Sequence, residues 1–307
     1  MAINWYPGHM HKAQKEIKDI ISDIDLIIEV LDARIPNSSE NPMIAQLRGE
    51  KPCIKILNKS DLADADTTAL WIEHFKSHKN TDALAVTAKT QESLQKIIPR
   101  CKDIVVRDVE EGKPMRVLIA GIPNVGKSTI INALAKRIVA KTGNEPAVTK
   151  SQQRINIGSG ITLFDTPGML WPKIHSEDSG YRLAVTGAIK ETAFELDDVA
   201  SYLADYLVVS YPEQLKTRYE LEELAPSGYE ILEDIGRKRG CLRSGGRVEI
   251  NKAAKILLTE LRETVLGRIS METPQMCMAE QLAIDKKLAA KAEKDAARKK
   301  KSKGRKR

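Results

Sequence analysis

The sequence predicts an α/β fold, in which helices flank a mainly parallel sheet, followed by a small all-helical unit and a basic tail. Short apolar runs of strand length alternate with helical stretches between residues 25 and 210, a pattern typical of βαβ units. Helical periodicity dominates from 211 to 284, and Ala and Lys dominate from 285 onward. We therefore expect domains at 1–210 and 211–284, with a tail at 285–307.

The expected sheet is built from short runs rich in Ile, Val and Leu that end in turn residues. Its strands are predicted at 26–31, 53–57, 83–86, 116–120, 153–157 and 161–164, and a run at 203–209 is expected to close the sheet. Helices are predicted at 68–77, at 91–101 and from 127 to about 138, and in the second unit at 213–224, 229–239 and 251–266.

Composition indicates a globular protein with a real core, since 42% of the 307 residues are apolar and 30% are charged. The apolar stretches are far shorter than the roughly 20 residues that a membrane span needs, and the N-terminus lacks the features of a secretory leader. A cytoplasmic protein without a membrane partner is expected. The four cysteines are far apart, with no CxxC pair and no His at metal spacing, so neither a disulfide framework nor a zinc site is expected.

The formal net charge of +7 is concentrated in the tail. Residues 285–307 hold nine Lys and three Arg against Asp285, Glu293 and Asp295, a balance of +9, which leaves −2 for the rest of the chain. A near-neutral body with a basic arm indicates a polyanionic partner such as nucleic acid; a solvated tail without a fixed partner is the alternative. We expect this arm to be disordered, or at most a nascent helix, until it binds.

A phosphate-binding loop is predicted at Gly121-Ile122-Pro123-Asn124-Val125-Gly126-Lys127-Ser128, between a predicted strand and a predicted helix. Its glycines let successive backbone N–H groups turn toward phosphates, and the helix N-terminus adds the positive end of its dipole. Lys127 is expected to reach the β and γ phosphates, and Ser128 to ligate Mg²⁺. The alternative, an accidental Gly-rich turn, does not explain the flanking strand and helix.

Guanine rather than adenine is predicted by Asn58-Lys59-Ser60-Asp61, at the end of an apolar strand. The Asp61 carboxylate can accept hydrogen bonds from N1–H and the exocyclic amine of guanine, while Asn58 and the Lys59 stem brace the base and the loop. Adenine lacks N1–H and would leave this carboxylate unpaired. Thr87-Ala88-Lys89 follows another predicted strand and matches a second guanine-side loop, whose backbone amide contacts the base oxygen. In isolation, either motif is a common surface turn.

The γ-phosphate side is predicted at Asp165-Thr166-Pro167-Gly168, where Asp165 holds Mg²⁺ through water and the Gly168 amide senses the γ-phosphate. Thr149 is the candidate switch threonine that adds a second hydroxyl ligand to Mg²⁺, with an ordinary loop residue as the alternative. The full set predicted to bind GTP is Asn58, Lys59, Asp61, Thr87, Ala88, Lys89, Asn124, Val125, Gly126, Lys127, Ser128, Thr129 and Gly168.

The order of these motifs is inverted relative to Ras-like GTPases, because the guanine motif stands more than sixty residues before the phosphate loop. Together with Trp5-Tyr6-Pro7-Gly8-His9-Met10 and Asp32-Ala33-Arg34-Ile35-Pro36, the motifs resemble the ribosome biogenesis GTPase A (RbgA/YlqF) family of circularly permuted GTPases, over nearly the whole chain. The chain departs from the family pattern at Ala147, where Gly is more usual, and in its long lysine tail; both departures leave the nucleotide site intact.

The resemblance implies a circularly permuted Ras-like P-loop GTPase domain, a C-terminal helical RNA-binding domain and a role late in assembly of the large (50S) ribosomal subunit. The permuted order also places Asp165 about forty residues before the helical unit, so loss of the γ-phosphate is expected to reposition that unit. Contacts with rRNA are expected from basic residues of the helical unit, for which a solvated helix face is the alternative. These residues are Arg237, Lys238, Arg239, Arg243 and Arg247.

Water activation needs an unusual source, because Met169 occupies the position at which Ras-like enzymes carry a water-orienting Gln. Asn124 lies where related GTPases hold K⁺, a cation that stabilises charge between the phosphates. His9 is the candidate water-orienting group, although a histidine near an N-terminus is commonly an ordinary residue. The ribosome would place either group. The predicted catalytic set is His9, Asn124 and Lys127, with Mg²⁺ and K⁺ as cofactors.

The main interpretation is a monomeric GTPase that binds pre-ribosomal RNA and leaves after hydrolysing GTP to GDP and phosphate. One alternative is a nucleotide-gated RNA-binding module whose turnover is incidental. Another is the permuted GTPase of the small subunit, which carries an OB-fold before the GTPase domain and a zinc site after it. Only 57 residues precede Asn58, and no Cys/His cluster follows the GTPase motifs, which argues against the last interpretation.

Overall fold

A six-stranded sheet forms the centre of the computed structural model, which describes residues 3, 5–105, 113–140, 152–174 and 176–304. The strand order is β3-β2-β1-β4-β6-β5, and all neighbours are parallel except β5 and β6. The strands are β1 (Leu26–Asp32), β2 (Cys53–Asn58), β3 (Thr81–Val86), β4 (Met115–Gly121), β5 (Gln153–Gly158) and β6 (Ile161–Asp165). The six strands predicted between residues 26 and 164 are confirmed.

The centre of the sheet joins the two halves of the permuted domain. β1 pairs with β4 in parallel, with Ile27 opposite Leu118, although these residues are far apart in the sequence. β4 therefore lies between β1 and β6, as the strand before a phosphate loop does in a Ras-like domain, yet it is the fourth strand of the chain. This order confirms the predicted circular permutation.

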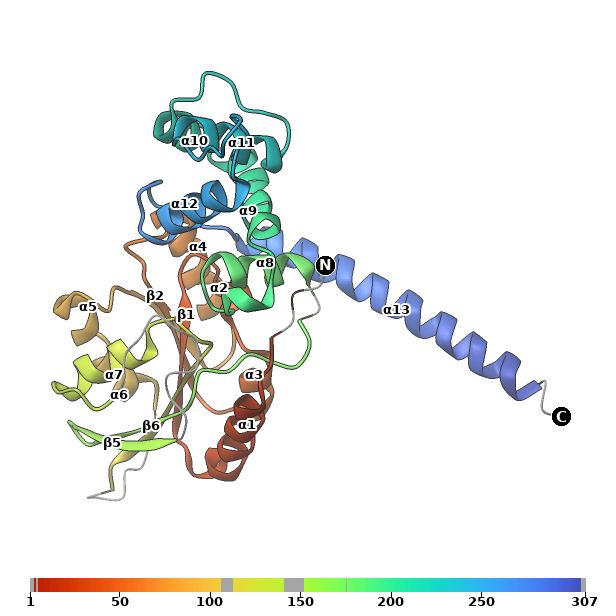
Figure 1. Cartoon of the computed structure of the whole chain (residues 1–307). Coiled ribbons are helices and arrows are strands. Elements are labelled where there is room, and N and C mark those ends of the chain that lie inside the picture. Colours follow the sequence, from red (N-terminus) through yellow and green to blue (C-terminus); the bar gives the residue numbers. More distant parts are fainter. Residues whose placement is uncertain (1–2, 4, 106–112, 141–151, 175, 305–307) are drawn as a thin grey trace.

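Helices cover both faces of the sheet, with α5, α6 and α7 on one side and α1 and α3 on the other (Figure 1). Asp64 caps α4, since its Oδ1 accepts a hydrogen bond from Thr67 N at 2.7 Å. The helix predicted at 91–101 is two helices that meet at Lys96. The helices of this domain are α1 (Gly8–Ile20), α2 (Pro36–Ser39), α3 (Pro42–Arg48), α4 (Ala65–Lys76), α5 (Gln91–Gln95), α6 (Ile97–Ile104) and α7 (Lys127–Ala135), with a 3₁₀ turn η1 (Ile21–Asp23).

The second part of the chain is helical, as predicted, and lies beyond one end of the sheet (Figure 1). Its elements are α8 (Glu177–Val185), η2 (Glu191–Ala193), α9 (Leu196–Ser210), α10 (Pro212–Tyr219), α11 (Gly228–Lys238), α12 (Ile250–Arg262) and α13 (Pro274–Gly304). The strand predicted at 203–209 is wrong, because these residues belong to α9. Val199, Leu203 and Leu207 are buried at a spacing of four residues, which is the period of a helix face.

The domain boundary predicted at residue 210 cuts between α9 and α10. α9 packs against α10, α11 and α12, and α8 packs on α9. The last two strands along the chain, β5 and β6, come before all of these helices. We therefore propose that the helical unit begins upstream of residue 211, at α8.

α13 crosses the predicted start of the tail. The helix begins at Pro274 and continues to Gly304, so the nascent helix expected from residue 285 is formed as part of a longer one. The disorder expected of the tail without a partner stays a prediction. None of the helices in the described ranges, α13 included, is long and apolar enough to span a membrane.

Candidate nucleotide-binding site

The predicted nucleotide motifs meet at one edge of the sheet. Asn58 is the last residue of β2, Thr87 follows β3, Gly121 ends β4 and Asp165 ends β6. Because these strands run parallel, their carboxyl ends lie at the same edge, where α/β proteins bind nucleotides. Motifs more than a hundred residues apart in the chain are thus brought together.

The phosphate loop requires its glycines for both conformation and space. Gly126 has φ +89°, and a Cβ at this residue would lie 2.3 Å from Asn58 Nδ2. A Cβ at Gly121 would lie 2.6 Å from the Val30 carbonyl oxygen, because the loop leaves β4 directly beside β1. α7 begins at Lys127, so the first backbone N–H groups of the helix are directed toward the loop.

Asn58 joins the phosphate loop to the second guanine-side loop. Its Nδ2 donates to Val125 O at 2.7 Å, and its Oδ1 accepts from Ala88 N at 3.1 Å. The predicted bracing role of Asn58 therefore acts on two loops. The Ala88 amide, predicted to contact the base oxygen, is held by Asn58 in this structure, and Lys89 beside it is exposed.

Lys59 is held by a buried carboxylate to which the sequence assigned no role. Lys59 Nζ lies 2.8 Å from Asp32 Oδ2, and Arg34 forms a second ion pair with the same oxygen at 2.7 Å. Burial raises the pKa of Asp32, but the charges of Arg34 and Lys59 outweigh it and hold that pKa well below its usual range. Asp32 therefore stays ionised and fixes the Lys59 stem. The sequence marks Asp32-Ala33-Arg34 as a motif but does not indicate this role.

Asp61 is the residue predicted to recognise the guanine base. It is half-buried in the turn after β2, and within the described ranges its side chain receives no hydrogen bond from the protein. Ser60 and Thr87 share a hydroxyl hydrogen bond of 3.0 Å, which ties the two guanine-side loops together. Both Asp61 carboxylate oxygens can therefore serve a guanine base.

Lys127 and Asp165 form an ion pair at the end of β6, and both side chains are buried. In the part of the chain that the structure describes, Asp165 Oδ2 has no hydrogen-bond partner. Burial raises the pKa of Asp165, while Lys127 lowers it. The ammonium of Lys127 neutralises here the carboxylate that the sequence assigns to Mg²⁺.

The residues at this position fit Mg²⁺. A buried carboxylate oxygen without a donor and the hydroxyl of Ser128, at the start of α7, are the hard oxygen ligands that this ion prefers. Bound Mg²⁺ would neutralise charge on the β and γ phosphates. Thr149, the predicted second hydroxyl ligand, lies outside the described residues.

The predicted γ-phosphate sensor lies against the phosphate loop. A Cβ at Gly168 would be 3.1 Å from Pro123 Cα, so the two loops are in close contact. Met169 is 1% exposed, and its carbonyl oxygen accepts from Asn41 Nδ2 at 2.9 Å. Met169 is therefore a core residue.

The first turn of α1 packs against the segment that follows Gly168. Met10 is fully buried, and its Sδ accepts from Leu170 N at 3.4 Å. His9 precedes Met10 in this turn; its side chain lies outside the described part of the chain. The backbone of the predicted water-orienting residue is thus near the γ-phosphate loop.

Asn124 connects the phosphate loop to the helical unit, a contact that no local sequence pattern indicates. Its Nδ2 donates to Gly187 O at 2.7 Å, in the turn after α8. At the same turn, Arg262 from the end of α12 donates to Val185 O at 2.7 Å and to Ala184 O at 3.0 Å. Hydrogen bonds at this turn therefore connect the phosphate loop to α12.

A second connection follows α12. Ile269 N donates to Leu62 O at 3.1 Å, directly beside the guanine motif, and Met271 N donates to Arg34 O at 2.8 Å. We call residues 269–272 the strap. It runs beside the predicted guanine motif before the chain enters α13.

Comparison with known proteins decides the family. A family model described as a 50S ribosome-binding GTPase matches residues 116–229. It begins within β4 and leaves out Asn58, as the inverted motif order requires. Ribosome biogenesis GTPase A of Bacillus licheniformis is 43% identical over 282 residues, which cover 90% of this chain and 99% of that protein. The chain belongs to the ribosome biogenesis GTPase A family.

A more distant relative and a solved structure support the same family assignment. Ribosome biogenesis GTPase A of Thermotoga maritima is 33% identical over 89% of this chain and 95% of that protein. YlqF of the same organism, solved with GDP, has a TM-score of 0.62 and 29% identity over 85% of this chain and 99% of its own. The chain is therefore a GTP-hydrolysing enzyme with the permuted architecture of this family.

Proposed function

We propose that this GTPase acts on late particles of the large ribosomal subunit, binds their rRNA in a nucleotide-dependent way, and leaves after hydrolysis. The observation that supports nucleotide dependence most directly is the hydrogen bond from Asn124 to Gly187, which joins the phosphate loop to the helical unit. A phosphate loop that rearranges around a γ-phosphate would displace this contact, and the helical unit would move with it. We propose a cytoplasmic monomer.

In the proposed reaction the chain binds GTP, neutralises charge on its phosphates and orients the attacking water. Asp61 selects guanine, Lys127 exchanges its carboxylate partner for the phosphates, and the N–H groups at the start of α7 hold the anion. Met169 is buried, so we assign the orientation of water to His9, which the ribosomal particle would bring to the nucleotide.

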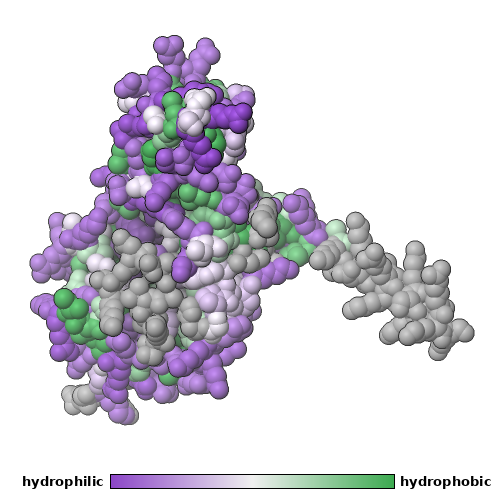
Figure 2. All heavy atoms as spheres, viewed as in Figure 1, coloured by the Kyte–Doolittle hydropathy of each residue, from purple (hydrophilic) through white to green (hydrophobic). Residues whose placement is uncertain are grey.

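The exposed basic residues of the helical unit are proposed to contact rRNA. Arg237 is partly neutralised by Asp234 and Glu233, at 2.8 and 3.0 Å, and Arg243 lies 3.7 Å from Glu249. The basic residues are exposed on a largely hydrophilic unit (Figure 2), and a phosphate can replace a partly exposed carboxylate partner. The proposed contact set is Arg237, Lys238, Arg239, Arg243 and Arg247.

Sedimentation with purified ribosomal subunits tests this function. We expect the protein to sediment with large subunits in a non-hydrolysable GTP analogue and to be released in GDP. Small subunits serve as the control, since the alternative of a small-subunit GTPase predicts the opposite preference. Equal binding in both nucleotides would contradict nucleotide-dependent binding.

Replacement of His9 by alanine is expected to slow particle-stimulated GTP hydrolysis by about 10²- to 10⁴-fold, the usual contribution of a general acid–base group. Binding to the particle should persist, because α1 is anchored by the neighbouring Met10. His11→Ala, two residues further along the same helix, is the matched control. A His9→Ala protein with wild-type turnover on particles would remove His9 from the mechanism.

The same variant separates a timer from a nucleotide-gated module with incidental turnover. If hydrolysis drives release, His9→Ala bound with GTP stays on the particle. If turnover is incidental, it leaves at the wild-type rate.

K⁺ is expected to support faster hydrolysis than Na⁺. Only the amide oxygen of Asn124 can ligate a cation, and its Nδ2 contact with Gly187 orients that amide. Steady-state rates measured in KCl and NaCl give the ratio, and Asn124→Ala should bring this ratio to one. Because a general loss of structure lowers both rates alike, the ratio isolates the cation effect; equal wild-type rates in the two salts would contradict it.

A further inference from the structure

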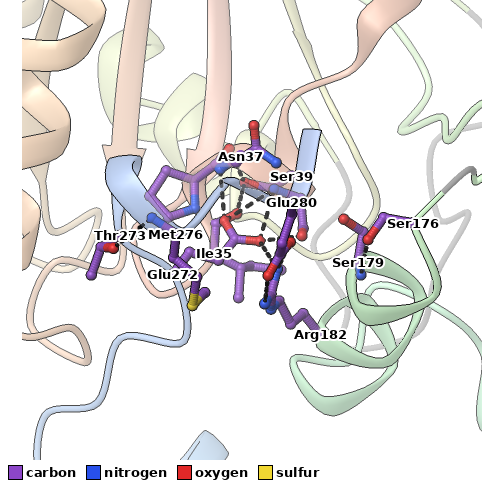
Figure 3. A network of polar contacts seen from close by, with 12 residues as sticks. Ile35, Asn37, Ser39, Ser176, Ser179, Arg182, Glu272, Thr273, Met276 and Glu280 are labelled. Carbon is purple, nitrogen blue, oxygen red and sulfur yellow. Dashed lines mark hydrogen bonds and ion pairs between the residues drawn. The ribbon is translucent and has the colours of Figure 1, made fainter. Parts of the chain in front are cut away.

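The first turns of α13 are anchored to the body of the protein. Cys277 is buried with Trp71 and Phe75 of α4. Glu280 forms a two-point ion pair with Arg182 of α8, at 2.9 and 2.6 Å, and the strap carboxylate Glu272 lies 3.4 Å from the same guanidinium (Figure 3). Contacts from two domains therefore fix where α13 begins and in which direction it points.

The rest of α13 leaves the body. Ile284 is partly covered, and residues 285–290 are all exposed. The helix continues to Gly304 and projects away from both domains (Figure 1). At 1.5 Å per residue, the part after 284 is about 30 Å long. Because the anchored turns provide the nucleus, the helix can extend along the Ala- and Lys-rich sequence without a separate nucleation step.

The basic residues of this projecting part follow the helical period. Positions 287, 291, 294, 298 and 301 are Lys, Lys, Lys, Arg and Lys, with spacings of four, three, four and three residues. This spacing puts them on one face of the helix, which we call the basic stripe. Like charges at these spacings destabilise an isolated helix. The stripe therefore lowers the stability of the free helix, and a polyanion lying along it would relieve this repulsion.

We propose that α13 beyond residue 284 is an RNA-binding arm, whose basic stripe lies along the phosphate backbone of double-helical RNA. A straight row of charges fits a regular phosphate backbone, and base edges are not needed for such contacts. The inference rests on the proposed function only for the source of the RNA, which is the ribosomal particle. The anchor at Arg182 and Glu280 sets the direction in which the arm meets it.

Two full-length variants with the same net charge test this arm. One replaces four stripe residues by Gln, and the other replaces four basic residues elsewhere in the arm. Binding is measured to a fluorescent RNA duplex of about 20 base pairs and to large subunits over a range of salt. The stripe variant is K287Q, K291Q, K294Q and R298Q; the control is K286Q, K299Q, K300Q and K303Q.

We expect the stripe variant to lose more than about tenfold in duplex affinity, with a salt slope smaller by about 3 to 4, since each phosphate contact contributes about 0.9. The control variant should lose clearly less. Equal losses of affinity in the two variants would mean that the arm binds as an unstructured polycation, which would contradict a role for the basic stripe. Wild-type affinity in both variants, or tighter binding to anionic vesicles than to RNA, would also overturn it.

GTP hydrolysis without particles, expected to be the same in all three proteins, shows that the variants fold. If the wild type binds the duplex but not large subunits, the proposed function fails and the arm stands. If the wild type binds large subunits, and the stripe variant binds the duplex and large subunits as tightly as the wild type does, the proposed arm is wrong and the proposed function stands.

Discussion

Asp61→Asn is expected to lower the affinity for GTP by on the order of 10⁴-fold and to create affinity for xanthosine triphosphate. Both Asp61 oxygens can accept from guanine, whereas an asparagine amide presents one acceptor and one donor. The donor would face the exocyclic amine of guanine, leaving two N–H groups opposed. Xanthine carries an oxygen at that position, so the same donor becomes a partner.

Competition against a fluorescent GTP analogue measures this switch, with GTP, XTP and ATP as competitors. Asp66→Asn, an exposed carboxylate in the first turn of α4, removes the same charge nearby and should leave GTP binding unchanged. The assignment of Asp61 would be wrong if the variant bound GTP as the wild type does. Binding of ATP should stay weak in all three proteins, because adenine lacks N1–H.

The nucleotide motifs were predictable because each is local. A strand, a glycine turn and a helix start lie within a few residues of one another in the phosphate loop, and the guanine motif directly follows a strand. The inverted order of the motifs also predicted a permuted domain, and the structure places β4, which leads into the phosphate loop, beside β1. The sequence therefore predicts a functional motif well where the functional residues and the backbone turn that positions them are adjacent in the chain.

The errors in secondary structure have specific physical causes. The run 203–209 is apolar and short, a case in which period alone does not separate a strand from a buried helix. The predicted helix 91–101 breaks at Lys96 because Pro99 has no N–H for the carbonyl of Gln95, four residues earlier.

Long-range contacts of the site could not be predicted from the sequence. Asn124 was singled out as a cation ligand, but its bond to Gly187 depends on how α8 ends, 63 residues later in the chain. Glu272 lies in an irregular segment with no motif, and its partners Arg182 and Ser38 are 90 and 234 residues away in the chain. Such residues become visible only when the fold brings their elements together.

Glu272→Ala is expected to destabilise the protein by about 3 to 5 kcal/mol, the usual effect of removing one partner of a buried ion pair. Glu272 is fully buried, and its carboxylate accepts from Asn37 N at 2.8 Å and from Ser38 N at 3.1 Å (Figure 3). Its loss leaves these two donors unsatisfied and leaves Arg182 with Glu280 alone. Urea unfolding followed by circular dichroism measures the change.

Two further variants identify the source of this destabilisation. Glu280→Ala removes a carboxylate that is 22% exposed, so water can replace part of what Arg182 loses, and a smaller effect is expected. The double variant Arg182→Met, Glu272→Leu removes both buried charges; it should recover much of the stability lost in Glu272→Ala, because the uncompensated guanidinium is gone. If the double variant is no more stable than Glu272→Ala, the contribution of Glu272 lies in its hydrogen bonds to Asn37 and Ser38. In that case the carboxylate acts chiefly to fasten the strap to the loop after Arg34, beside the GTP site.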